Sequence, residues 1–142
     1  MNTHCRYLVS CVGKKKSRPA LAGELYTSNW LLKARADVES TGMPWFVRSA
    51  EHGLLSPGQR VSPYEKTLHR MALVDRRLWA QRVLRQLDAA GVVDGRVVFL
   101  AGQRYRAFLA PRLVAQGLEV EVPMEGLGIG QQLRWLTERG MG

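Results

Sequence analysis

Short apolar runs alternate with segments of helical periodicity along the 142 residues of this chain. Four runs predict β-strands and four longer segments predict helices, in strict alternation. Such alternation favours a mostly parallel sheet with helices on both faces. We therefore expect an α/β protein, a three-layer α/β/α fold around a four-stranded, mostly parallel sheet. The predicted strands are residues 7–12, 45–47 and a little beyond, 96–101 and 118–122. The predicted helices are residues 30–39, 74–90, a segment opening at 102–105 that Pro111 interrupts or restarts, and 131–139.

The segments that follow the predicted strands carry most of the chemically active residues. Parallel strands bring their carboxyl ends to one edge of a sheet, and ligands of such sheets bind outside that edge. Here the edge would collect residues 11–17, 49–52, 102–105 and 125–130. The segments that enter the strands, 42–44, 91–95 and 116–117, are blander turns. This asymmetry predicts a functional site at the carboxyl edge.

The second predicted strand runs directly into Ser49, Glu51 and His52, within the stretch 45–57. A carboxylate and an imidazole at a strand end can be held in place for chemistry, although a plain solvated turn would have the same sequence. If the strand continues through both residues, their side chains point to opposite faces. We then expect Glu51, rather than His52, to face the ligand.

A basic loop and a glycine-rich turn are the candidate phosphate-binding segments. A solvated turn and a tight structural turn are the alternatives for these two segments. The glycine turn precedes a helix, where backbone amides and the helix dipole favour an anion. It does not fit the dinucleotide fingerprint, because Gln131 stands at the last glycine position. The candidate phosphate- and DNA-binding residues are Lys14, Lys15, Lys16, Arg18, Gly126, Gly128 and Gly130.

The charge of the chain is strongly basic. It has 21 Lys and Arg against 12 Asp and Glu, a formal net charge of +9. Such an excess suggests a polyanionic partner, since basic side chains that neutralise phosphates release condensed counterions. A merely soluble basic protein is the alternative. We expect DNA as the partner.

The cysteines and the apolar runs indicate the compartment. Cys5 and Cys11 lie on or near one predicted strand, too far apart along it for a disulfide, and they lack the spacing of a metal site. We find no signal peptide at the N-terminus and no run near the ~20 apolar residues of a membrane span. We therefore expect a cytoplasmic protein without membrane contact, cofactor or metal. A single domain over residues 1–142 fits the length, with a monomer favoured.

The residues at the predicted edge suit cleavage of an N-glycosidic bond. Positive charge develops on the sugar, and Glu51 or Glu125 can stabilise it or activate water, while His52 supports the departing base. A base within DNA would first be flipped out of the duplex. Gln103 could read a base edge, and Tyr105 or Tyr64 could stack on it. The candidate substrate-binding residues are Cys11, Ser49, Tyr64, Gln103 and Tyr105.

Several blocks of the chain together resemble an uncharacterised bacterial and phage domain family of unknown function. These blocks are LVSCVGKKK, ELYTS, SAEHGLLSP, PYEKTL and FLAGQRYRAFL. That family is distantly similar to YaaA peroxide-stress proteins, which are associated with DNA binding, and to the uracil-DNA-glycosylase-like domain of archaeosine synthase. The resemblance implies a glycosylase-like α/β/α fold. This chain lacks the Asp-Pro-Tyr-His and His-Pro-Ser loops of typical uracil-DNA glycosylases, so their catalytic residues are not transferred to it.

The leading hypothesis is a DNA glycosylase-like hydrolase that removes a modified base from DNA, with antiviral defence as its expected role. Two alternatives stay open. One is an N-glycosidase that acts on free nucleosides or nucleotides, and the other is a non-catalytic, YaaA-like DNA-binding stress protein.

Overall fold

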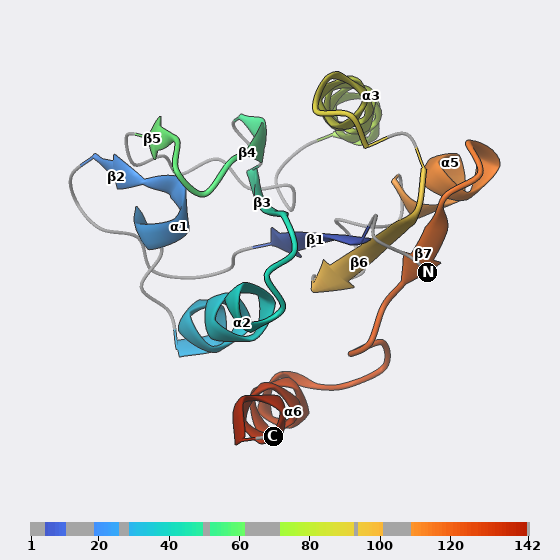
Figure 1. Ribbon diagram of the computed structural model, residues 1–142. Helices are drawn as coiled ribbons and strands as arrows, with labels where there is room; N and C mark the ends of the chain where they lie inside the picture. Colours follow the sequence, from blue (N-terminus) through green and yellow to red (C-terminus); the bar gives the residue numbers. More distant parts are fainter. Residues whose placement is uncertain are drawn as a thin grey trace.

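The computed structural model describes residues 5–10, 19–25, 29–49, 52–61, 72–92, 94–100 and 109–141. Its main sheet has five strands in the order β4-β3-β1-β6-β7 (Figure 1). These strands are β1 (Cys5–Ser10), β3 (Trp45–Ser49), β4 (Gly53–Leu55), β6 (Arg96–Leu100) and β7 (Glu119–Glu121). The pairs β1–β3, β1–β6 and β6–β7 are parallel, and β4 runs antiparallel to β3. The sheet is therefore mostly parallel, as the sequence predicts.

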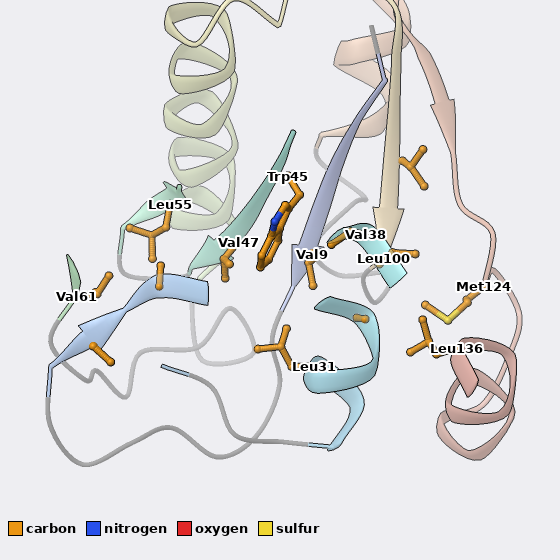
Figure 2. Close-up of a cluster of buried hydrophobic side chains, with 14 residues drawn as sticks. Val9, Leu31, Val38, Trp45, Val47, Leu55, Val61, Leu100, Met124 and Leu136 are labelled. Carbon is orange, nitrogen blue, oxygen red and sulfur yellow. The ribbon is translucent and has the colours of Figure 1, made fainter. Parts of the chain in front are cut away.

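Helices cover both faces of this sheet. Helices α2 (Asn29–Ser40) and α6 (Ile129–Met141) lie on one face, and α3 (Leu73–Ala89) and α5 (Ala110–Ala115) lie on the other (Figure 1). Alternate residues of the strands supply the two cores: Val9 and Val47 point toward α2, whereas Leu8 and Phe99 point toward α3. Figure 2 shows the first core, where Leu31 of α2 lies near Val9 and Leu136 of α6 lies near Met124. The three-layer arrangement is confirmed. None of the helices in these ranges is both long and apolar enough to cross a membrane.

The prediction of four strands is wrong by one in the main sheet. The segment between the second predicted strand and the helix predicted from residue 74 contains β4, in which Leu54 packs on the α3 side and Leu55 on the α2 side. It also contains β5 (Arg60–Val61), which pairs antiparallel with β2 (Ala20–Leu21), next to the short helix α1 (Ala22–Leu25). These elements were missed because runs of two to four residues are too short to show a periodicity.

The long helices lie within two residues of their predicted positions at each end. The buried residues of α3 are Trp79, Ala80, Val83 and Leu87, and Leu84 is half-buried. Pro111 stands in the first turn of α5, where proline is tolerated, and the helix predicted to open at residues 102–105 lies outside the described residues. The edge strand β7 has exposed Glu119 and Glu121, as its alternating sequence predicts.

Polar contacts join α2 to α6 at the end of the chain. The indole of Trp30 donates a hydrogen bond to Gln132 Oε1 at 2.9 Å. Arg139 Nε donates to Asp37 Oδ1 at 3.1 Å, and the Asp37 side chain is buried. The guanidinium of Arg139 also lies 4.8 Å from the ring centroid of Trp135. These contacts hold the last helix in register with α2.

The amino-terminal end of β1 makes a prediction about alkaline pH. Burial, and to a lesser degree Cys5, raises the pKa of the Tyr7 phenol. Between its ordinary pKa of about 10 and the raised value, the folded state binds the phenolic proton more tightly than the unfolded chain, so stability falls as pH rises. The contribution is fully present below pH ~10. Chemical denaturation at pH 8 to 11 should therefore show a steeper alkaline loss in the wild type than in Tyr7→Phe. Parallel curves would contradict this cause.

Candidate functional site

The carboxyl ends of three parallel strands lie side by side at one edge of the sheet. β1 ends at Ser10, which pairs with Arg48 of β3, and Val9 pairs with Leu100, the last residue of β6. The chain passes from β1 to β3 on one side and then crosses to β6 on the other side of β1. The strand order therefore reverses between β1 and β6. In doubly wound sheets the ligand binds outside the carboxyl ends at this switch point.

The predicted site residues divide into two groups. One group lies outside the described residues and stays a prediction. The other group is placed by the structure. Outside lie Cys11, Lys14, Lys15, Lys16, Arg18, Glu51, Tyr64, Gln103 and Tyr105, and inside lie Ser49, His52, Glu125, Gly126, Gly128 and Gly130.

The turn between β3 and β4 carries Ser49 and His52. Ser49 is buried, pairs with Gly53 across the hairpin, and its Oγ accepts a hydrogen bond from the His52 backbone N–H at 3.0 Å. The strand ends at Ser49, and His52 lies in the turn. The assumption that the strand continues through His52 is therefore wrong. Glu51 lies outside the described residues, so its orientation stays a prediction.

Two side chains of α3 fix this turn through its backbone. Trp79 Nε1 donates to the Ser49 carbonyl at 2.8 Å in a buried hydrogen bond. Gln86 accepts from the Leu54 N–H at 2.8 Å and donates to the His52 carbonyl at 3.2 Å. The turn is thus held from three backbone positions by one helix. A fixed support of this kind is what a site on a loop needs to keep its geometry.

Neither Trp79 nor Gln86 was recognised from the sequence as a residue of the site. A usable signal was present, because Gln86 lies seven residues after Trp79 and so on the same face of the helix. A glutamine on the side of a helix that packs against the sheet needs hydrogen-bond partners, since buried polar groups are costly without them.

Gly53 makes the contact with Gln86 possible. Its φ of +78° lies in the left-handed region, and a Cβ at this position would collide with Gln86 Oε1. We expect Gly53→Ala to lower the free energy of unfolding by about 2–4 kcal/mol, about half from the backbone conformation and half from the lost Gln86 bonds. Urea denaturation measures this loss.

Gly42→Ala is the matched control for that change. Gly42 has a φ of +72° but no atom within 4 Å of the added Cβ, so only the backbone cost of about 1–2 kcal/mol is expected. In a Gln86→Ala background the cost of Gly53→Ala should fall to this same value. Additive losses in the double variant would show that Gly53 and Gln86 are not coupled.

A buried positive charge lies at the end of β3. Arg48 is 1% exposed, and its Cζ atom lies 5.2 Å from the ring centroid of Phe99 and 5.9 Å from that of Trp79. Aromatic faces attract a guanidinium at these distances. Because an isolated buried charge is costly, such neighbours help Arg48 to remain buried at the end of β3.

The turn after β7 forms a separate part of the edge. Glu125 is exposed within it, and Gly126 has a φ of +83°. The Gly128 N–H donates to Gln131 Oε1 at 2.9 Å, so the start of α6 is capped by its own side chain. α6 begins at Ile129, which corrects the prediction that Gly130 belongs to the preceding turn. An anion at Gly128 would have to displace Gln131.

The structure does not bring Glu125 and His52 together through their strands. β3 and β7 are separated by β1 and β6 in the sheet, three spacings or about 14 Å. Ser49, His52 and Arg48 form one group at the β3 end, and Glu125 belongs to another. In the described part of the chain, no three His, Cys, Asp or Glu side chains gather in a way that could hold a metal ion.

The strand order and the two helical layers define a doubly wound α/β protein with its candidate site at the carboxyl edge. The chain belongs to DUF6884, a family of unknown function whose model matches residues 7–138. This match confirms the predicted membership of an uncharacterised domain family. No curated protein and no solved structure gave a match. The more distant resemblance to YaaA proteins and archaeosine synthase therefore stays a prediction.

Proposed function

We propose that this protein is a DNA glycosylase-like enzyme that hydrolyses the N-glycosidic bond of a modified base in DNA. The observation that carries the proposal is the switch point between β1 and β6. In the sequence, β1 is followed by the basic run Lys14 to Arg18, and β6 by Gly102, Gln103, Arg104 and Tyr105. The basic run suits the phosphates of a nucleic acid, and the segment after β6 suits recognition of a base.

The reaction needs a group that activates water beside the sugar. In the proposed step, the Glu51 carboxylate takes a proton from water while the water oxygen bonds to C1′ of the sugar. The bond from C1′ to the base nitrogen breaks, and its electron pair leaves with the base, which receives a proton from a donor such as His52. The α3 helix supports this step because Trp79 and Gln86 fix the backbone on both sides of Glu51.

The buried Arg48 supports the same assignment. Arg48 places a buried cationic group in β3, three residues before Glu51 in the sequence, and opposite charges attract. Glu125, three strand spacings away, is better suited to contact the substrate at the far side of the site than to share this step.

The four parallel strands between two helical layers are also what a uracil-DNA-glycosylase-like fold requires, and that finer fold assignment is part of the proposal. A cytoplasmic location and a role in defence against foreign DNA belong to it as well. The direct test is incubation of the purified protein with oligonucleotides that carry different modified bases, followed by detection of abasic sites. Failure to release any base from a broad panel would refute the enzyme assignment.

A non-catalytic DNA-binding protein is the second candidate. The strand order favours it, because two strands stand between β3, which leads into the His52 turn, and β7, which leads into the Glu125 turn. This candidate predicts DNA binding with a steep salt dependence that survives Glu51→Gln and Glu125→Gln, and no released base.

A further inference from the structure

The outer face of α3 carries an excess of positive charge. The helix contains four arginines and two aspartates, and the aspartates lie near its two ends at Asp75 and Asp88. Leu78, Arg82 and Arg85 are exposed and lie at spacings of three, four and seven residues, so they share one face. We call these three residues the α3 ridge.

Arg85 differs from the arginines of the other helices in its ion pairing. Arg35 of α2 pairs with Glu39, and Arg134 of α6 pairs with Glu138, both at the helical spacing of four residues. Within the described ranges Arg85 makes no ion pair, and the arginine three residues before it, Arg82, has the same charge. Like charges one helical turn apart destabilise a helix by a few tenths of a kcal/mol. An external anion would remove this repulsion.

The ridge lies directly beside the turn at the candidate site. A Cβ placed on Gly53 would lie 3.6 Å from Arg82 Cδ, so the aliphatic part of Arg82 packs along this turn. Gln86, one helical turn further on, is bonded to His52 and Leu54. The same helix therefore holds the turn with one face and presents Arg82 and Arg85 to solvent with the next.

We propose that Arg82 and Arg85 bind adjacent phosphates of a nucleic acid strand that runs along α3 past the Ser49–Gly53 turn. This inference rests on the proposed function and adds a binding surface to it. Side chains three residues apart on a helix stand about 5–6 Å apart at Cβ, which lets two arginines reach neighbouring phosphates of one strand. Leu78, 56% exposed, adds an apolar surface that suits the sugar face of such a strand better than a free phosphate ion.

Binding to unmodified fluorescent oligonucleotides, single- and double-stranded, tests the ridge over a range of salt concentrations. The full chain is compared with Arg85→Ala and with the double variant Arg82→Ala/Arg85→Ala. Each lost phosphate contact lowers the slope of log K against log salt by about 0.7–0.9, so the double variant should lose about 1.4–1.8. The matched control is Arg134→Ala, an exposed arginine on the opposite face of the sheet, which should leave the slope unchanged.

Arg85→Ala keeps the test valid if loss of the Arg82 packing unfolds the double variant, and its slope should fall by about 0.7–0.9. An unchanged slope in a folded Arg85→Ala variant would overturn the inference. So would binding of the wild type to anionic phospholipid vesicles without binding to DNA. Ridge-dependent DNA binding without base release from any substrate would refute the proposed enzyme and keep the ridge. If the ridge variants release base and the salt dependence of KM is the same as in the wild type, the ridge would be refuted and the proposed enzyme would be kept.

Discussion

Replacement of Trp79 by alanine is expected to lower the free energy of unfolding by about 3–5 kcal/mol, the usual range for a buried tryptophan. Trp79 is 4% exposed, packs in the core between α3 and the sheet, and holds the Ser49 carbonyl. Its ring also faces the guanidinium of Arg48, which lies near the rings of both Trp79 and Phe99. Of these two rings, truncation of Trp79 leaves only that of Phe99 beside the buried charge. Chemical denaturation with an unchanged m-value measures the loss.

Trp79→Phe separates the hydrogen bond from the packing. It keeps an aromatic ring but removes the N–H that bonds to Ser49, and we expect a loss of about 1–3 kcal/mol from the unsatisfied buried carbonyl. If Trp79→Phe matched Trp79→Ala, the packing would contribute little. If Trp79→Ala cost less than 1 kcal/mol, the proposed support of the turn by α3 would be wrong.

The second large effect is expected on activity. Glu51→Gln should reduce the rate of base release by about 10²–10⁴-fold, since an amide cannot accept the proton of the attacking water. DNA binding should survive, because the phosphate contacts are assigned to other residues. Single-turnover kinetics on an oligonucleotide that the wild type cleaves measure the change.

Glu138→Gln is the matched control for Glu51→Gln. Glu138 is an exposed carboxylate on α6 that pairs with Arg134, and its neutralisation should leave the rate unchanged. Equal activity of Glu51→Gln and the wild type would remove Glu51 from the chemistry. It would then leave His52 and Glu125 as the titratable groups to test.

The fold was largely predictable because buried parallel strands and amphipathic helices leave regular patterns in a sequence. Residues 97–100 form a continuous apolar run within β6, and the helical periodicity of α3 identified that helix within a residue at each end. β4 was not predicted because its three residues, Gly53 to Leu55, are too few to show the alternation of a strand. The burial of Arg48 was not predicted, because arginine is almost never fully buried, yet it lies against two aromatic rings from distant elements.

The candidate site was predictable only in outline. The rule that ligands bind at the carboxyl edge needs no more than the order of strands and helices. Trp79 and Gln86 fix the β3–β4 turn through hydrogen bonds between positions 30 to 34 residues apart. A single sequence does not reveal such contacts. The separation of Glu125 from His52 likewise follows from the strand order, which places two strands between their turns.

The most direct test of the proposed function is detection of abasic sites after incubation of the wild-type protein with DNA that contains modified bases. The account predicts abasic product from at least one modified base, and a rate at least about 10²-fold lower for Glu51→Gln under the same conditions. DNA that is bound but never loses a base, across the panel and with either enzyme form, would contradict it.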